Sequence, residues 1–270
     1  MGTEKEFLSQ YSIENYERPS VTTDVAAFTI GSKEENSYRH NPENTLLILL
    51  IKRGEHPFKD QWALPGGFLR PSETVEECAL REIVEETGVN PSTIKPVGVF
   101  SKPGRDPRGW IISNAFASII CDADIKTANG YDASDAKWFA VSLKKNVSGM
   151  YYLNLECDGI EVNAVLKKKS NKLCRPCLEI VESNGLAFDH AEIITVALEI
   201  LKKSADSFDV IFNFLPEKFT LNSLQKVLET ITEVPVVPAN FRRKIEGMVI
   251  ETDEYKSGAG HRPAKLFRKK

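Results

Sequence analysis

Three glutamates lie close together in a segment with helical character. At about 100° per helical residue, Glu82 and Glu86 are about 40° apart, and Glu85 lies about 60° to the other side of Glu82. Like charges at this spacing slightly destabilise a helix, so helix stability does not account for them. A hard cation does, because Mg²⁺ takes carboxylate oxygens and bridges to phosphate oxygens. The alternative is a solvated acidic helix face.

The predicted helix lies between two glycine signals. The turn Leu64-Pro65-Gly66-Gly67 cannot continue as a helix, and Gly88 is a typical residue after a helix end. Ser72 is the expected N-cap, with acids in the first turn. The apolar stripe on the other face comprises Val75, Ala79, Ile83 and, less regularly, Leu80 and Val84.

The spacing of the whole segment is more specific than its acids alone. Gly67 is followed after five residues by Glu73, and after seven more by Arg81-Glu82-Ile83. One residue then precedes Glu85-Glu86, and one more precedes Gly88-Val89. This pattern resembles the Nudix box at every defining position. The resemblance implies an α/β/α sandwich with a mixed sheet, and Mg²⁺-dependent attack of water on a diphosphate that joins a nucleoside to another group.

The resemblance also assigns roles to individual residues. It implies a Mg²⁺ site, with Mn²⁺ as an alternative ion, whose ligands are Glu82, Glu85, Glu86 and the carbonyl oxygen of Gly66. Glu73 and Arg81 would support these ligands, so the catalytic set comprises Glu73, Arg81, Glu82, Glu85 and Glu86. The ion would neutralise diphosphate charge and lower the pKa of a bound water.

Residues 101–109 are rich in proline, glycine and arginine, which excludes regular structure. Arg105 or Arg108 could fork onto phosphate oxygens, and Asp106 lies between them. A Gly-Arg-Asp-Pro-Arg-Gly loop after the box resembles the ADP-ribose-type subgroup of Nudix proteins, which implies substrate binding by Arg105, Asp106 and Arg108. An ordinary solvated loop is the alternative.

Two further acids are candidates for the general base. Asp132 and Asp135 follow a glycine-containing turn, where similar Nudix hydrolases often place a catalytic acid. A loop acid that caps a turn is the competing interpretation.

Length and composition set wider bounds. The chain has 270 residues, 41% hydrophobic and 27% charged, with net charge −3, which suits a two-domain globular protein without a global attraction to nucleic acid or membrane. No apolar run approaches the ~18 residues of a membrane span, and the N-terminus does not resemble a signal peptide. The odd count of five cysteines favours a reducing cytoplasm.

The predicted first domain covers residues 1–203, with strands at 20–30, 45–51, 95–100 and 110–121. Residues 143–184 are expected to be an insertion or an extension of the sheet. Cys157, Cys174 and Cys177 lie there; they could bind zinc with His190 as a fourth ligand, but free thiols are the default. A helix over 188–201, with Asp189 as N-cap, would close the domain. His190 is expected at the start of this helix rather than in the chemistry.

The second predicted domain, residues 204–270, begins within a polar linker expected at 202–206. Helices at 208–215, 221–231 and 240–248 precede two strands, a pattern typical of a winged helix-turn-helix. Residues 240–270 carry 9 basic and 4 acidic side chains. The expected DNA-binding residues are Arg242, Arg243 and Lys244 on the third helix and Arg262 and Lys265 on the wing. A protein-interaction or dimerisation domain is the alternative.

This domain resembles that of the Nudix-related (NrtR-type) transcriptional regulators, on Asn-Phe-Arg-Arg-Lys at 240–244 and Arg-Pro-Ala-Lys-Leu-Phe at 262–267. Those regulators often lose catalytic residues, whereas this chain keeps its acids. We therefore expect a cytoplasmic Mg²⁺-dependent hydrolase of ADP-ribose or a similar nucleoside diphosphate derivative, which binds double-stranded DNA as a homodimer. The alternatives are a ligand-sensing regulator with little or no turnover, and a hydrolase with a structural C-terminal domain.

Overall fold

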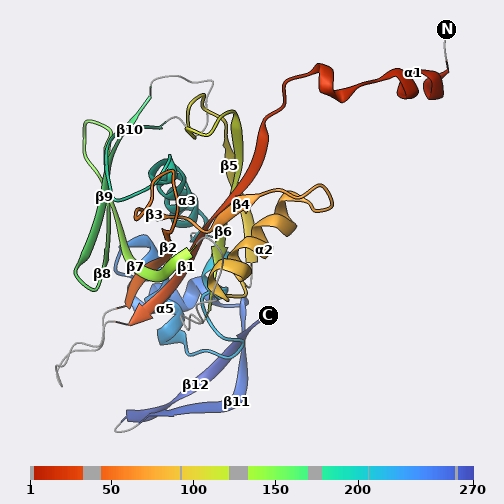
Figure 1. Cartoon of the computed structure of the whole chain (residues 1–270). Helices are drawn as coiled ribbons and strands as arrows, with labels where there is room; N and C mark the ends of the chain where they lie inside the picture. The colour runs from red at the N-terminus through yellow and green to blue at the C-terminus, as the bar shows by residue number, and fades with distance from the viewer. Residues whose placement is uncertain are drawn as a thin grey trace.

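The computed structural model describes residues 3–32, 44–91, 93–121, 133–169, 178–205, 207–258 and 261–270. A ten-stranded mixed sheet forms its centre (Figure 1). The main strand order is β10-β9-β8-β7-β2-β1-β6-β5, and the short strands β3 and β4 pair with β2 and β1. β1 and β6 run parallel, and the other pairs are antiparallel.

The bounds of these strands and of the helices around them are as follows. The strands are β1 (Ser20–Ser32), β2 (Asn44–Arg53), β3 (Trp62–Ala63), β4 (Gly66–Phe68), β5 (Thr93–Phe100), β6 (Ile111–Ile119), β7 (Ala133–Lys145), β8 (Met150–Cys157), β9 (Ile160–Lys168) and β10 (Leu178–Asn184). The helices α2 (Val75–Thr87) and α3 (His190–Ala205) belong to this part, and a short helix, α1 (Glu4–Gln10), and a 3₁₀ turn (Ile13–Asn15) precede β1. Figure 1 shows α1 projecting away from the sheet.

The apolar run in β2 is buried on both faces, as its sequence predicts. Ile48 and Leu50 belong to the hydrophobic core that α3 covers, whereas Leu49 and Ile51 belong to the core that α2 covers. A strand alternates its side chains between the two faces, so a continuous apolar run suits a central strand with helices on both sides. The result is the expected α/β/α sandwich with a mixed sheet.

The start of α2 differs from the expectation. Its N-cap is Thr74, not Ser72: the Thr74 hydroxyl accepts from the Glu77 amide, and Glu77 accepts from the Thr74 amide. This reciprocal capping box satisfies two amides that the helix leaves without partners, whereas Ser72 offers only one side of such a pair. Gly88 ends the helix in the left-handed conformation, with φ of 69°.

The segment 143–184 continues the main sheet in its described part. β8 pairs with β7, β9 with β8, and β10 with β9, all antiparallel. Alternate side chains of β8, such as Tyr151, Leu153 and Leu155, are buried in the same core that α3 covers. Cys157 lies on β8, and Cys174 and Cys177 lie outside the described residues.

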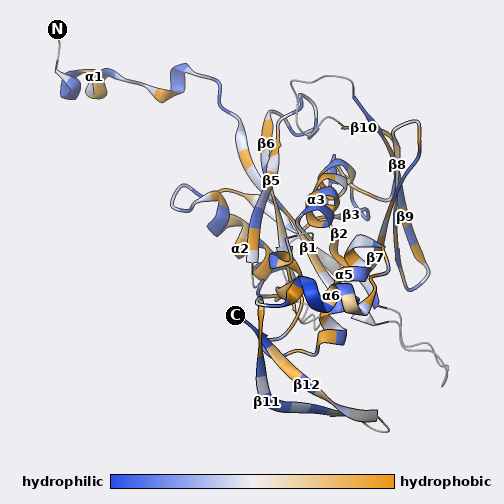
Figure 2. Ribbon diagram, turned by 180° about the vertical axis from the view of Figure 1, so that it is seen from behind, coloured by the Kyte–Doolittle hydropathy of each residue, from blue (hydrophilic) through white to orange (hydrophobic). Residues whose placement is uncertain are grey.

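The C-terminal part is a winged helix. It contains α4 (Asp209–Phe212), α5 (Leu221–Thr232), α6 (Pro238–Ile245) and the hairpin β11 (Val249–Gly258) and β12 (His261–Lys269). α6 starts and ends earlier than the predicted 240–248, because a proline suits the first turn of a helix and Gly247 adopts φ of 86° beyond its end. Figure 2 shows a hydrophilic stretch on α6.

The expected polar linker at 202–206 is helical over its described part, residues 202–205. α3 continues to Ala205, and Leu201 and Ala205 are 4% and 0% exposed. α3 contacts both α4 and α5, and α5 also contacts β2. One hydrophobic core therefore includes Phe28 and Ile48 of the sheet together with Leu224 and Phe241 of the winged helix. No helix in the described ranges is both long and apolar enough to span a membrane.

Candidate functional site

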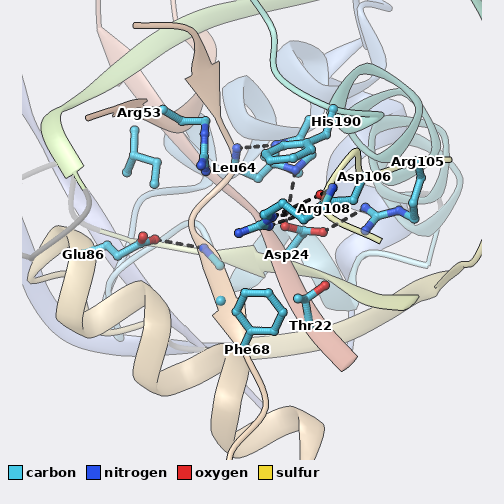
Figure 3. Close-up of a pocket in the computed structure, with 14 residues that line it drawn as sticks. Thr22, Asp24, Arg53, Leu64, Phe68, Glu86, Arg105, Asp106, Arg108 and His190 are labelled. Carbon is cyan, nitrogen blue, oxygen red and sulfur yellow. Dashed lines mark hydrogen bonds and ion pairs between the residues drawn. The ribbon is translucent and has the colours of Figure 1, made fainter. Parts of the chain in front are cut away.

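Helix α2 brings two of the predicted metal-binding carboxylates, Glu82 and Glu86, next to the glycine turn. The Gly66 amide donates to Glu86 Oε2 at 2.9 Å, as Figure 3 shows. A Cβ on Gly67 would lie 2.3 Å from Glu82 Oε1, so only glycine allows this carboxylate to approach the backbone so closely. Burial raises the pKa of Glu82 despite its bond to Arg81. Glu82 and Glu86 thus both lie next to the turn that carries the Gly66 carbonyl, which is another expected metal ligand.

Arg81 is the cation that balances this acidic face. Its Nε and Nη2 atoms donate to the two Glu73 oxygens at 2.9 and 2.7 Å, and Nη1 donates to Glu82 at 2.6 Å and Glu85 at 3.1 Å. The hydrogen bonds from Arg81 lower the pKa of Glu73 to about 2. Glu85 is the most open of these acids and also meets Arg70 at 3.5 Å. Among the described residues, no three acidic, histidine or cysteine side chains converge in a geometry that would hold an ion.

A pocket opens beside the turn. It is lined by residues of β1, β2, the turn, α2, the 101–109 loop and the start of α3: Thr22, Asp24, Ile51, Arg53, Leu64, Gly66, Gly67, Phe68, Glu86, Arg105, Asp106, Arg108, Phe188 and His190. Figure 3 shows Arg105 and Arg108 on the opposite side of the turn from Glu86. The pocket therefore joins two predicted metal ligands, Gly66 and Glu86, to the predicted substrate loop.

The two arginines of the loop have different surroundings. Arg105 is buried, and it donates to both oxygens of Asp189 at 2.8 and 2.6 Å and to Asp24 at 3.4 Å. Its guanidinium group is already paired with two carboxylates. This differs from the expectation that Arg105 could bind phosphate oxygens. Arg108 is the more exposed, with 41% of its side chain accessible.

Arg108 is held at the pocket by a carboxylate and two rings. It makes a forked ion pair with Asp106, with contacts of 2.8 to 3.2 Å. Its guanidinium carbon lies 5.1 Å from the ring centre of Phe68 and 5.6 Å from that of Phe188. Burial raises the pKa of Asp106, but the hydrogen bonds and charge of Arg108 outweigh burial and lower it overall. Arg108 is thus the arginine of this loop that can turn toward an anion.

Sequence reasoning missed Asp24, and it placed His190 outside the chemistry. Asp24 lies on β1 and accepts from Ser113, Arg105 and His190. Burial opposes its ionisation, but these neighbours lower its pKa to about 2. His190 is the first residue of α3, as expected, and is also buried against the pocket. No local signal marks either residue, because their partners are at least 81 residues away.

The candidate general bases remain predictions. Asp132 lies outside the described residues. Asp135 belongs to β7, where its backbone pairs with Lys52 of β2.

The expected DNA-binding residues lie on one helix and the wing. Arg242, Arg243 and Lys244 of α6 are exposed, whereas Phe241 and Ile245 face the core. Arg262 belongs to β12. Lys265, also on β12, lies 4.6 Å from the ring centre of Tyr255. The basic run of α6 is therefore presented to solvent by the two apolar residues that flank it.

The mixed sandwich, the acid-bearing helix after a glycine turn and the appended winged helix define a two-part protein. Residues 37–148 match the NUDIX domain, and residues 211–268 match the NrtR DNA-binding winged helix domain. The chain thus contains a Nudix domain and an NrtR-type winged helix domain.

Individual relatives extend this result. The ADPR responsive transcriptional repressor NtrR of Acinetobacter baylyi is 28% identical over 99% of this chain and 88% of its own. The ADP-ribose pyrophosphatase of Methanocaldococcus jannaschii is 50% identical over 34% of this chain and 53% of its own. The crystal structure of Shewanella oneidensis NrtR complexed with a 27mer DNA is 26% identical, with a TM-score of 0.61 over 93% of each chain.

Proposed function

We propose that this protein is a DNA-binding regulator that binds ADP-ribose or a similar nucleoside diphosphate derivative, and that it also hydrolyses the diphosphate of this ligand. The observation that carries hydrolysis is the intact acidic set around the glycine turn. Glu82 and Glu86 contact the turn from α2, and Glu73 holds Arg81 beside them. The similarity to a repressor over the whole chain supports regulation.

The donor set fits a divalent cation. Carboxylates and a backbone carbonyl are the oxygen ligands that Mg²⁺ takes, and Gly67 leaves room for the closest carboxylate. Glu82, Glu85, Glu86 and the Gly66 carbonyl would hold the ion. When bound, the ion would neutralise diphosphate charge and make a bound water more acidic.

The remaining pocket residues would bind and orient the ligand. Arg108 can exchange part of its contact with Asp106 for phosphate oxygens, because it is exposed and its fork matches a phosphate. Phe68 and Phe188 offer apolar surface beside it. Arg105 binds Asp24 and Asp189 beside the pocket and so holds these three side chains in place.

The test is steady-state hydrolysis of ADP-ribose with Mg²⁺ by the wild type and by Glu86→Gln. The change keeps the size of the side chain but removes the charge that the cation needs. We expect kcat to fall by about 100-fold or more, since losing only a supporting group of a metal site costs about 10- to 100-fold. Unchanged turnover would refute the metal assignment. DNA binding by the same variant is expected to stay within about twofold of wild type when no ligand is present.

A second candidate is a regulator that binds the ligand with little turnover. The contacts of Arg81 favour it, because two of the proposed metal ligands, Glu82 and Glu85, are already paired with this cation. Calorimetric binding of ADP-ribose without hydrolysis by the wild type would favour this candidate over the first.

A further inference from the structure

His190 makes two contacts that the proposed reaction does not use. Its Nδ1 atom accepts from the backbone amide of Leu64 at 2.9 Å. A neutral imidazole that accepts at Nδ1 carries its proton on Nε2, and Nε2 lies 3.4 Å from Asp24 Oδ1. The ionised Asp24 therefore favours this tautomer and holds the ring in place. Figure 3 shows His190 between Leu64 and Asp24.

The amide of Leu64 needs a side-chain acceptor because of the local topology. Trp62 donates to the Gly185 carbonyl at 2.8 Å, and Ala187 donates to the Trp62 carbonyl at 2.9 Å. The chain then turns into α3, so the backbone ladder ends before it reaches Leu64. Leu64 is only 2% exposed, and a buried amide requires a partner. The imidazole supplies the acceptor that the backbone no longer provides.

The next two residues of the turn are also fixed, each by a different element. The Pro65 carbonyl accepts from the Val25 amide of β1 at 2.8 Å. The Gly66 amide donates to Glu86 of α2 at 2.9 Å. Three successive residues are thus tied to α3, β1 and α2. Loss of the first tie leaves these two contacts and the pairing of β4 with β1 to determine where the Gly66 carbonyl points.

We propose that His190, oriented by Asp24, is a positioning residue that holds the glycine turn so that the Gly66 carbonyl and Glu86 face the same divalent cation. The inference rests on the proposed metal-dependent function of this site. It gives α3, which continues into the winged helix, a direct contact with the metal-binding turn.

A matched pair of amide substitutions separates the two contacts of His190. His190→Asn places an amide oxygen close to the position of Nδ1, so it keeps the acceptor for Leu64. His190→Gln places its amide close to the position of Nε2, so it keeps a partner for Asp24 but not for Leu64. Thr195→Val is the control, since Thr195 is a buried residue of α3 whose hydroxyl donates only to Ala191 within the helix.

The measurements are Mn²⁺ binding by electron paramagnetic resonance, hydrogen exchange of the segment around Leu64, and ADP-ribose hydrolysis. For His190→Gln we expect about tenfold weaker Mn²⁺ binding, faster exchange at Leu64 and at least a tenfold lower kcat, with KM within about threefold of wild type. His190→Asn and Thr195→Val should stay within about threefold of wild type in all of these quantities.

Equal Mn²⁺ binding by the wild type and His190→Gln would overturn the proposal, and so would a tenfold loss in His190→Asn. Because His190→Asn is measured separately, its result tests the proposal even if His190→Gln does not fold. If the wild type binds Mn²⁺ but does not hydrolyse ADP-ribose, while His190→Gln weakens Mn²⁺ binding, the positioning role stands and the hydrolase proposal fails.

Discussion

The charged side chains under the pocket are buried and paired, whereas those on the basic face of α6 are exposed. Under the pocket, Arg105 has a side chain that is 4% exposed and is bound by two aspartates. On α6, Arg242 and Lys244 are exposed, and within the described ranges neither takes part in an ion pair. Buried charges must be balanced before any ligand arrives, because an uncompensated buried charge is costly. Exposed charges cost little and remain available to a polyanion.

This comparison separates structural charge from binding charge. Arg105 and Arg108 lie three residues apart, and from the sequence both were candidates to bind phosphate. Arg105 is buried in the interior, whereas Arg108 is partly exposed at the pocket. A substitution in the pocket network is therefore expected to change stability, and one on α6 to change affinity alone.

The connection between the two regions is the first target. Leu201 lies in α3 and in the core that both parts share, so Leu201→Ala should lower the free energy of unfolding by about 3 kcal/mol. Denaturant unfolding should remain a single transition, because α3 packs on both parts. The neighbouring Lys202→Ala is the control; it breaks only a solvent-accessible pair with Glu233 and should cost less than about 1 kcal/mol. Two separated transitions in the wild type would contradict the shared core.

The buried network should show a pH-dependent stability. The pKa of Asp24 is about 2 in the folded protein against an ordinary 3.8, so folding favours its ionised form. Its contribution is complete above about pH 4 and is lost as pH falls through 2, and it amounts to about 2 kcal/mol. Asp24→Asn should therefore be less stable than wild type by this amount at pH 7, with the difference shrinking below pH 4.

Denaturant titrations at pH 7, 4 and 3 measure this difference. Asp253→Asn, an exposed substitution on the wing, is the control and should show no such trend. A difference that grows as the pH falls would contradict an ionised, stabilising Asp24.

The basic face should respond in affinity instead. Arg242→Ala with Arg243→Ala should weaken binding of promoter DNA by about tenfold or more and reduce the slope of log affinity against log salt by about 2. Stability should stay within about 0.5 kcal/mol, because both side chains are exposed. Lys95→Ala with Lys144→Ala removes the same charge from the exposed surface of the sheet domain and is the control. Equal losses in both double variants would indicate attraction by net charge alone.

The smallest effect is expected at a helix cap. Thr220 caps α5 through a reciprocal pair with Ser223. Thr220→Ala should lower the free energy of unfolding by about 1 kcal/mol, whereas Thr220→Ser keeps the hydroxyl and should be nearly neutral. Thermal unfolding of the two variants side by side measures the difference. An equal loss in both would assign the effect to the methyl group rather than to the cap.

Local signals predicted most of the secondary structure. The apolar run of β2, Gly88 at the end of α2 and the helix predicted at 221–231, which is α5, all lie where local patterns place them. The prediction failed where two local signals competed, as at Ser72 and Thr74, and where a polar surface stretch continued a buried helix, as at residues 202–205. In the second case, Leu201 and Ala205 bury the inner face of α3 while its lysines remain outside.

The chemistry of α2 and the kind of domain at each end of the chain follow from local residue patterns. Residue types at fixed helical spacing place the acids on one side of a single element, and that arrangement needs no distant contact. Which charges are paired inside the protein depends on the tertiary structure. Arg105, Asp24, Asp189 and His190 come from the 101–109 loop, β1 and the start of α3, and they meet because the sheet brings these segments to one pocket. A buried charge takes its role from the partners that balance it, and those partners are distant in sequence.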